Sequence, residues 1–345
     1  MSAVKVLVTG ANGFLATNVV NVLLSKGYKV IGTARSEAKY ESLLKEFKAK
    51  YPKGDLSFEI VKDMATPNAF DDVLKKHTDI KNVIHTAAPF SFGSGKTPEE
   101  AFKIPAVEGT KNVLKAIAGY GPQVEHVVVT SSYVTMMEFM KPQPAVNENY
   151  WSSLTWDQVG DSEFLGYCAS KKLAEEAAWD FMKTQSPKFS LTAITAPYIF
   201  GPHVFDFQVG KTINVSNQVI INASDIDPST TEAQKEGSAV FADVRDIAFA
   251  HVAPLSTTSM NNKRVLPCAG TYCTQDVLNA MNKVPVLKGK VAVGDPSYCD
   301  TEEYKKSLPV VDCSESVKLL DNIQFITLDK CVADTYEQYY RVNDL

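Results

Sequence analysis

The sequence VKVLVTGANGFLA, residues 4–16, decides the fold. Its first part, Val4–Thr9, is a short β-branched run that predicts a strand, and an apolar pattern with helical period follows from Phe14. Gly10 permits a sharp turn between the two elements. Gly13 lets backbone N–H groups approach an anion at the positive end of the helix. The stretch is therefore typical of the strand, turn and helix that open a dinucleotide-binding domain.

Strand and helix signals alternate through the first 200 residues. Helical stretches of this length between strands form right-handed crossovers, so we predict an α/β fold with a doubly wound parallel sheet of six or more strands. The further predicted strands are 29–33, 57–61, 82–86, 126–131 and 191–195, and the further predicted helices are 37–50, 68–77, 106–117 and 166–183.

The alternation fades beyond Pro202, where the polar stretch 225–237 predicts a loop. The remaining candidates are helices at 244–252, 274–281 and 328–341 and a strand at 264–268. We therefore predict a Rossmann domain over residues 1–200, with part of 238–270 packing back on it. A smaller, irregular α/β domain, mainly for substrate binding, is predicted over residues 201–345.

Composition and charge exclude several classes of protein. The chain has 345 residues, 45% of them hydrophobic and 22% charged, as in soluble globular proteins. A net charge of -5 offers no positive field for nucleic acid, and no apolar run reaches the roughly 18 residues that span a membrane. The six cysteines form no C-x-x-C pair and the five histidines show no metal-ligand spacing. We expect a cytoplasmic protein with reduced thiols, no metal, and neither nucleic acid nor membrane as partner.

The residue after the second predicted strand distinguishes NAD from NADP. A carboxylate there binds the free 2′-hydroxyl of NAD, whereas a cation favours the 2′-phosphate of NADP. This chain has Arg35, with Lys39 one helical turn later, and only four of its 35 basic residues are arginines. We therefore predict NADPH rather than NADH. Asp63 is a candidate acceptor for the adenine amino group, or else a plain turn aspartate. Thr86 and the small Ala87 would let the cofactor lie close to the sheet edge.

Tyr167 and Lys171 form a Y-x-x-x-K pair, one turn apart on one face of the predicted helix 166–183. With 14 tyrosines in the chain, about one such pair is expected by chance, so its weight comes from the preceding strand, which ends in Thr130-Ser131-Ser132. A nearby ammonium stabilises a phenolate and makes a phenol a better proton donor at neutral pH. We predict Tyr167 as the donor to a carbonyl oxygen, Lys171 as its activator and Ser132 as a second hydrogen-bond donor, with Ser131 as the alternative.

TGANGFLA, Arg35, Ser132 and YCASKK stand in the order and spacing of the extended short-chain dehydrogenase/reductases, which this chain resembles over nearly its whole length. Segments such as KVIGTARS, HTAAPF, VPVLKG and DVRDIAFAHV resemble the yeast NADPH-dependent methylglyoxal reductase and carbonyl reductase group, related to dihydroflavonol reductases. The resemblance implies a catalytic triad of Ser132, Tyr167 and Lys171, with Lys171 also holding the nicotinamide ribose. Residues expected to contact NADPH are Gly10, Asn12, Gly13, Phe14, Leu15, Arg35, Lys39, Asp63, Thr86, Ala87, Tyr167, Lys171, Pro197 and Tyr198.

Two positions depart from the pattern of that family. The family usually has its proline one position earlier, where this chain has Ala196 before Pro197, which affects the loop beside Tyr198. Ala106 replaces the asparagine that often begins the N-V-x-G-T helix motif, so no fourth catalytic residue is assigned.

The resemblance implies NADPH-dependent reduction of aldehydes and ketones, including 2-oxoaldehydes such as methylglyoxal, diketones and bulky or aryl ketones. Aromatic residues expected to line the substrate pocket are Phe90, Tyr133, Phe164 and Tyr198, although large apolar residues are as often buried for packing. An NAD-linked nucleotide-sugar epimerase or dehydratase is one alternative, which Arg35 disfavours. A non-catalytic dinucleotide sensor is the other, and the pair of Tyr167 and Lys171 disfavours it. We expect a monomer or a homodimer.

Overall fold

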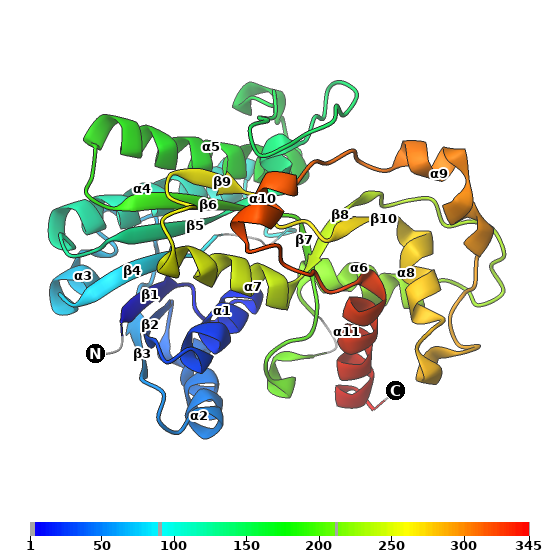
Figure 1. The fold of residues 1–345 in the computed structure, drawn as a ribbon, viewed down its shortest axis with the longest axis horizontal. Helices are drawn as coiled ribbons and strands as arrows, with labels where there is room; N and C mark the ends of the chain where they lie inside the picture. Colours follow the sequence, from blue (N-terminus) through cyan, green and yellow to red (C-terminus); the bar gives the residue numbers. More distant parts are fainter. Residues whose placement is uncertain (1–3, 89–91, 211–212, 345) are drawn as a thin grey trace. The chain divides into compact units, whose positions relative to one another are not determined.

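The computed structural model describes residues 4–88, 92–210 and 213–344 (Figure 1). The chain divides into two compact units. The first unit comprises Met1–Pro142, Glu148–Thr195 and Ala248–Leu266, and the second comprises Gln143–Asn147, Ala196–Ile247 and Pro267–Leu345. The expected boundary at residue 200 thus falls at 195, and of the stretch 238–270 it is residues 248–266 that belong to the first unit.

The first unit contains a seven-stranded sheet in the order β3-β2-β1-β4-β5-β6-β9, which is the doubly wound arrangement expected from the sequence. Its strands are β1 (Lys5–Thr9), β2 (Lys29–Ala34), β3 (Leu56–Ile60), β4 (Ile80–His85), β5 (His126–Ser132), β6 (Ser190–Ala196) and β9 (Lys263–Val265). Thr9 of β1 is in register with His85 of β4, and His85 with Val129 of β5. The carboxyl ends of these three central strands therefore meet at one edge.

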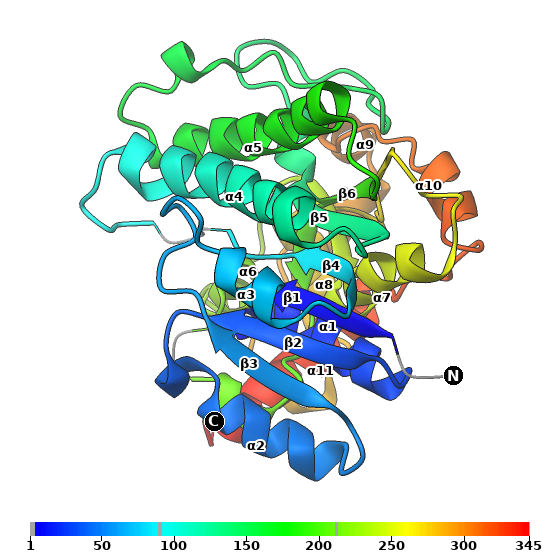
Figure 2. The same ribbon diagram turned by 90° about the vertical axis from the view of Figure 1, so that its left-hand side faces the viewer.

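Helices α3, α4 and α5 cover one face of this sheet, where they share a hydrophobic core with the central strands (Figures 1 and 2). The right-handed crossovers that join β1 to β2 and β2 to β3 place α1 and α2 on the opposite face. The helices of this unit are α1 (Phe14–Ser25), α2 (Glu41–Lys50), α3 (Asp71–Lys76), α4 (Ile104–Tyr120) and α5 (Glu163–Gln185).

Several elements differ from their predicted bounds by a few residues, and three of these differences have local reasons. The helix expected over 37–50 is a 3-10 turn, Glu37–Lys39, followed by α2, and the ring of Tyr40 between them stacks on Phe58 at 4.4 Å. The helix expected from residue 68 begins at Asp71, because Asn68 has a left-handed φ of 66°. The strand expected over 264–268 ends at Val265, because Pro267 lacks the N–H that would continue the ladder.

The second unit contains a three-stranded sheet in the order β10-β8-β7, packed with helices around its own core. Its strands are β7 (Tyr198–Phe200), β8 (Ala239–Asp243) and β10 (Gly270–Tyr272). Its helices are α6 (Val215–Ser224), α7 (Val244–Val252, of which 248–252 count to the first unit), α8 (Thr274–Met281), α9 (Glu302–Ser307), α10 (Ser314–Leu319) and α11 (Leu328–Val342).

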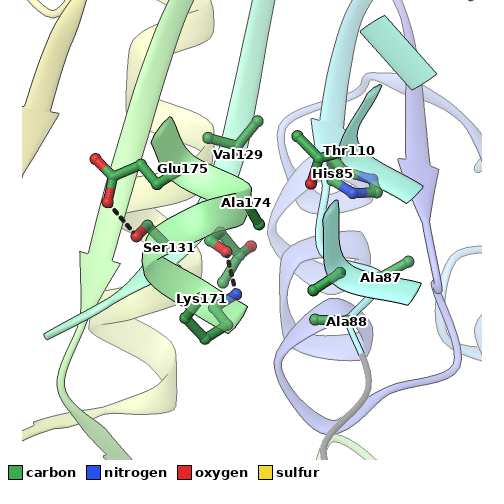
Figure 3. Close-up of a pocket in the computed structure, with 11 residues that line it drawn as sticks. His85, Ala87, Ala88, Thr110, Val129, Ser131, Lys171, Ala174 and Glu175 are labelled. Carbon is green, nitrogen blue, oxygen red and sulfur yellow. Dashed lines mark hydrogen bonds between the residues drawn. The ribbon is translucent and has the colours of Figure 1, made fainter. Parts of the chain in front are cut away.

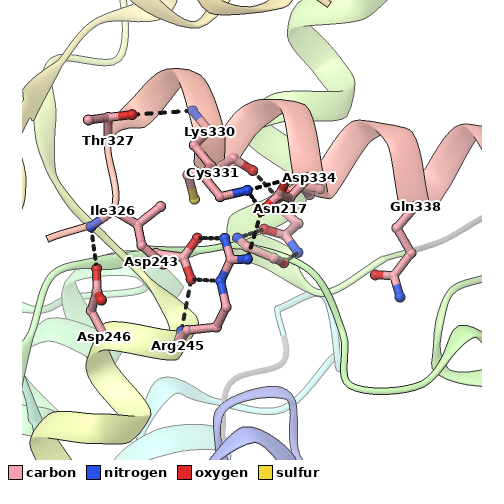
Figure 4. Close-up of polar contacts among 12 residues, drawn as sticks. Asn217, Asp243, Arg245, Asp246, Ile326, Thr327, Lys330, Cys331, Asp334 and Gln338 are labelled. Carbon is pink, nitrogen blue, oxygen red and sulfur yellow. Dashed lines mark hydrogen bonds and ion pairs between the residues drawn. The ribbon is translucent and has the colours of Figure 1, made fainter.

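An ion-pair network around the buried Asp243 carboxylate links β8, α7 and α11 of the second unit. Arg245 donates to both oxygens of Asp243 and reaches Asp334 of α11, with nitrogen-to-oxygen distances of 2.7–2.8 Å (Figure 4). Asp246, which accepts a hydrogen bond from the Ile326 amide, has its pKa raised to about 6 by burial. Replacing Arg245 would leave the buried Asp243 carboxylate without its partner, which is destabilising.

Three further findings concern the described residues as a whole. Within 4–88, 92–210 and 213–344, no helix is both long and apolar enough to cross a membrane. The same residues contain no group of three or more His, Cys, Asp or Glu side chains arranged to hold a metal ion. All six cysteines are free thiols.

Candidate active site

The turn between β1 and α1 is built around Gly10, which has a left-handed φ of 65°. A Cβ at this position would lie 3.0 Å from Cα of Ala87 and 3.1 Å from its Cβ. The Gly10 amide donates to the Thr33 hydroxyl at 3.2 Å, and the Ala11 amide donates to the Thr33 carbonyl at 2.9 Å. Gly10 is therefore required twice, by its backbone conformation and by the close approach of the segment after β4.

Replacing Gly10 by alanine should lower the free energy of unfolding by about 2–4 kcal/mol, because strain at φ 65° adds to the contact with Ala87. Gly27→Ala is the matched control, since Gly27 has φ 80° but a Cβ added there would have no neighbour within 4 Å. That variant should lose only about 1 kcal/mol. Urea unfolding of both variants measures the difference, and equal losses would contradict a role for the contact with Ala87.

The N-terminus of α1 offers backbone donors to a ligand. Gly13 occupies the N-cap position in extended conformation and has no side chain to cap the helix. It is exposed, while Asn12, Phe14 and Leu15 are half-buried. A Cβ on Gly13 would make only ordinary contacts within the protein, the nearest being 3.4 Å from the Gly10 carbonyl oxygen. No other protein atom crowds the space beside Gly13, as the predicted approach of a pyrophosphate to the helix N-terminus requires.

Arg35 stands directly after β2 and is exposed. The other three arginines, Arg245, Arg264 and Arg341, all form ion pairs with carboxylates. Among the described residues none forms a hydrogen bond or ion pair with the Arg35 guanidinium. Lys39, which closes the 3-10 turn, is also exposed. Positive charge without an internal partner at the end of β2 fits the 2′-phosphate expected there.

Asp63 is exposed in the turn after β3, where its carboxylate accepts a hydrogen bond from the Ala65 amide at 2.9 Å. This contact is that of a turn aspartate, and it uses one carboxylate oxygen. The proposed bond to an adenine amino group stays a prediction.

The end of β4 is tied to the glycine turn through Thr9. The Thr9 hydroxyl lies 2.8 Å from Nδ1 of His85 and accepts from the Ala87 amide at 3.2 Å, while the Thr86 hydroxyl donates to the Thr9 carbonyl. Burial, reinforced by the nearby charge of Lys171, lowers the pKa of His85 to about 3. His85 is therefore neutral at physiological pH and acts as a fixed hydrogen-bonding group.

The two candidate serines at the end of β5 have different partners. Ser131 is buried, and its hydroxyl donates a hydrogen bond to the Glu175 carboxylate on α5. Ser132 caps the 3-10 turn η3 (Tyr133–Met136), where its oxygen accepts from the Val134 amide at 3.4 Å. Successive residues of a strand point to opposite faces, so only one of the two hydroxyls can face a given ligand. The bond to Glu175 occupies Ser131 and favours Ser132 as the donor to a substrate.

Lys171 is buried at the middle of α5 and donates to the Thr130 carbonyl at 2.7 Å. Burial lowers the pKa of its ammonium to about 8, while the charge of Glu175 acts in the opposite direction. One turn earlier, the half-buried Tyr167 packs in a cluster that includes Val134 of η3. The structure thus brings Tyr167 and Lys171 together with the strand end that carries Ser132.

Two aromatic rings hold Tyr167 from the side. Phe92 and Phe102 contact its ring edge-on, with centroid separations of 6.0 and 6.1 Å. Phe102 is fully buried in a π-helical turn, η2 (Glu99–Lys103), which precedes α4. Such turns are rare and recur at functional sites. Edge contacts of this kind pack the Tyr167 ring on two sides and so favour one position of the side chain.

A small cavity lies beside Lys171 between the ends of β4 and β5 and the helices α4 and α5 (Figure 3). Its volume of about 20 Å³ suits a single water molecule. The residues that line it are His85, Ala87, Ala88, Ala106, Thr110, Val129, Thr130, Ser131, Lys171, Ala174 and Glu175. The cavity therefore connects the segment that contacts Gly10 with the base of the predicted catalytic lysine.

The predicted pocket residues fall in different surroundings. Phe90 lies outside the described residues. Tyr133 is buried, with 5% of its surface exposed, whereas Phe164 is 46% exposed and packs edge-on against Phe139 at 5.9 Å. In the second unit, Tyr198 of β7 is 39% exposed and follows Pro197. The place of Pro197 and Tyr198 beside the nicotinamide stays a prediction.

Several residues of the site were not expected from the sequence: Thr9, His85, Phe102, Glu175 and Arg264. One signal was available for Glu175, which stands four residues after Lys171 and so continues the face that carries Tyr167 and Lys171. The scarcity of arginine was another, since it applies to Arg264 as well as to Arg35.

Comparison with known proteins agrees with this geometry. Residues 6–266 match the profile of the NAD dependent epimerase/dehydratase family. The chain is 38% identical to the NADPH-dependent methylglyoxal reductase GRE2 of Saccharomyces cerevisiae over 342 residues, 97% of each chain. It is 32% identical to the ketoreductase azaE of Aspergillus niger over 342 residues, 96% of each chain.

A solved structure extends the likeness to the whole fold. The crystal structure of the yeast methylglyoxal/isovaleraldehyde reductase Gre2 complexed with NADPH has a TM-score of 0.90, 37% identity and coverage of 99% of both chains. Together with the glycine turn and the Y-x-x-x-K pair on α5, these matches show that the chain belongs to the NAD dependent epimerase/dehydratase family, the extended group of the short-chain dehydrogenase/reductases.

Proposed function

We propose that this protein reduces aldehydes and ketones to alcohols with NADPH, and that its substrates include 2-oxoaldehydes such as methylglyoxal, diketones and bulky or aryl ketones. The observation that carries the proposal is the buried Lys171 ammonium on α5, one turn from Tyr167 and bonded to the end of β5. The names of the relatives, which are reductases of such carbonyl compounds, support the same substrate class.

NADPH, when bound, supplies a hydride to the carbonyl carbon. Gly10, Asn12, Gly13, Phe14 and Leu15 would hold its pyrophosphate, and Arg35 and Lys39 its 2′-phosphate. Thr86 and Ala87 would flank it at the end of β4, with Asp63 at the adenine. Lys171 would also hold the nicotinamide ribose.

The protein's own part in the reaction is to supply a proton. As the carbonyl oxygen gains negative charge, the Tyr167 hydroxyl donates its proton to that oxygen, and the Lys171 ammonium stabilises the phenolate left behind. Ser132 donates a hydrogen bond to the same oxygen, and because η3 fixes its backbone, this donor is in place before the reaction. Phe92 and Phe102 keep the Tyr167 ring in position.

The function is tested by following the absorbance of NADPH, and separately of NADH, against methylglyoxal, a diketone, an aliphatic aldehyde and an aryl ketone. The proposal predicts oxidation of NADPH with several of these substrates and much slower oxidation of NADH. Tightly retained NAD and no consumption of free NADPH would instead identify an epimerase or dehydratase. Binding of NADPH without oxidation by any carbonyl would identify a dinucleotide sensor.

Arg35→Gln should raise the KM for NADPH about 10- to 100-fold and leave that for NADH within about twofold, because only NADPH carries the 2′-phosphate that the guanidinium binds. Arg341→Gln is the control, since Arg341 is an exposed arginine paired with Asp206 in the second unit. Steady-state kinetics with both cofactors measures the effect. An equal rise for NADPH and NADH would contradict the assigned role of Arg35.

We also propose that the protein acts in the cytoplasm as a monomer or homodimer, with a small carbonyl compound rather than nucleic acid or membrane as its partner. The six free thiols and the net charge of -5 support this. Analytical ultracentrifugation distinguishes the two assembly states.

A further inference from the structure

The Glu175 carboxylate is buried one turn beyond Lys171 on α5, with 1% of its side chain exposed. It accepts hydrogen bonds from the Ser131 hydroxyl, from the indole nitrogen of Trp179 at 3.0 Å and from Arg264, whose Nε lies 2.7 Å from Oε1 and whose Nη2 lies 3.3 Å from Oε2. A buried carboxylate with this many donors is held in one orientation.

The Arg264 guanidinium is also buried, with 8% of its side chain exposed, and reaches several elements at once. Besides Glu175, it donates to the carbonyl oxygens of Glu148 and Tyr150 at 2.8 and 2.6 Å, and to the Thr135 hydroxyl at 2.7 Å. Its plane lies over the ring of Trp151, 3.9 Å from the centroid. Arg264 is thus fixed on β9 by contacts that do not depend on Glu175 alone.

Glu175 and Arg264 are connected to the predicted catalytic residues in two ways. On one, Glu175 binds Ser131, while Arg264 binds Thr135, whose hydroxyl donates to the Ser132 carbonyl at 2.9 Å. On the other, Glu175 and Lys171 line the same cavity, and Figure 3 shows both side chains on α5, with the Glu175 carboxylate turned to Ser131 and the Lys171 amine turned away from it. The pair of Glu175 and Arg264 therefore acts on the Ser132 backbone through hydrogen bonds and on the Lys171 ammonium through charge.

The charges around Lys171 are few. Of the residues that line the cavity, Lys171, Glu175 and His85 have ionisable side chains, and the pKa of about 3 keeps His85 neutral. Tyr167 and Glu163 precede Lys171 at four-residue spacing on the same face of α5, and Arg264 approaches from β9 through Glu175. Glu175 is thus the negative charge that offsets the buried Lys171 ammonium, and Arg264 partly neutralises it.

We propose that Glu175, held in place by Arg264, is a positioning residue that keeps Lys171 protonated in the working pH range and fixes the strand end that carries Ser132. The inference rests on the proposed reductase function, because Lys171 and Ser132 act in that reaction. Glu175 itself touches neither substrate nor cofactor. Removal of its charge leaves two buried cations, so Lys171 loses its proton at lower pH.

Glu175→Gln keeps the size of the side chain and removes its charge. If the pKa of Lys171 falls from about 8 by about one unit, kcat at pH 8 should fall about five- to tenfold while kcat at pH 6 stays within about twofold. The alkaline limb of the kcat profile should therefore move to lower pH. A merely structural role would lower kcat by the same factor at both pH values and leave the limb in place, which would overturn the proposal.

Arg264→Gln should move the alkaline limb of the kcat profile in the opposite direction. It also keeps the proposal testable if Glu175→Gln does not fold. Without the guanidinium, the full charge of Glu175 acts on Lys171, so the alkaline limb should move to higher pH. A shift to lower pH, or no shift, would contradict the proposal. Thermal unfolding of each variant with bound NADPH establishes that the protein measured is folded.

Asp243→Asn is the matched control, because it breaks the ion pair of the buried Asp243 with Arg245 in the second unit. It should lower the melting temperature without moving the alkaline limb. Failure of the reductase function itself would appear differently, as a wild-type protein that oxidises NADPH with none of the carbonyl substrates.

Discussion

Tyr167→Phe is expected to lower kcat about 10²- to 10⁴-fold while the Kd for NADPH stays within about threefold. The variant removes one oxygen atom and keeps the ring, so its packing against Phe92 and Phe102 is retained. Without the hydroxyl, no positioned group of the described site delivers a proton to the carbonyl oxygen. Rapid-reaction measurement of hydride transfer, together with fluorescence titration of NADPH, separates the chemical step from binding.

The control for this variant is Tyr120→Phe, since Tyr120 is an exposed tyrosine at the end of α4. It should leave kcat unchanged. Turnover of Tyr167→Phe within tenfold of the wild type would remove Tyr167 as the proton donor. Loss of NADPH binding in parallel with turnover would point instead to a structural role for the hydroxyl.

Lys171→Met should lower kcat about 10²- to 10³-fold, because it keeps the apolar length of the side chain and removes the charge that stabilises the phenolate. The wild-type kcat should fall as pH rises through the Lys171 pKa of about 8, since the ammonium is present below that value and lost above it. The variant should lack this step. A pH profile of kcat between 6 and 10 measures both effects.

Lys172→Met provides a closely matched control. Lys172 is the next residue of α5, is also largely buried, and donates to the Leu154 carbonyl at 3.0 Å, but it is not among the residues that line the cavity beside Lys171. Its replacement should lower stability modestly and leave the pH profile of kcat in place. An alkaline step that persists near pH 8 in Lys171→Met would show that another group titrates there.

The first half of the fold was predictable because its strands and helices are set by local patterns. The alternation of β-branched and amphipathic segments predicts β1 to β6 and the five helices between them, and right-handed crossovers predict a parallel sheet with helices on both faces. The order of the strands does not follow from this pattern. The extra break at Tyr40 was not predictable, since the ring that stacks on it, Phe58, comes from β3. Such contacts between distant segments have no signature in the local sequence.

The site was predictable where a motif carries its own chemistry. Gly10, Arg35 and the pair of Tyr167 and Lys171 were expected from residue type and spacing, and their roles stay predictions. The choice between Ser131 and Ser132 was open in the sequence. It depends on Glu175, whose partner Arg264 lies 89 residues further along the chain. A network of that range is visible only in three dimensions.

The direct test of the proposed reaction is a crystal structure of the protein with NADPH and an unreactive carbonyl analogue of its substrate. Its central distance is that between the Tyr167 hydroxyl oxygen and the carbonyl oxygen. We expect about 2.6–3.2 Å, with the carbonyl carbon facing the nicotinamide ring. A Tyr167 hydroxyl turned into the protein interior, out of hydrogen-bonding reach of the carbonyl, would contradict the mechanism.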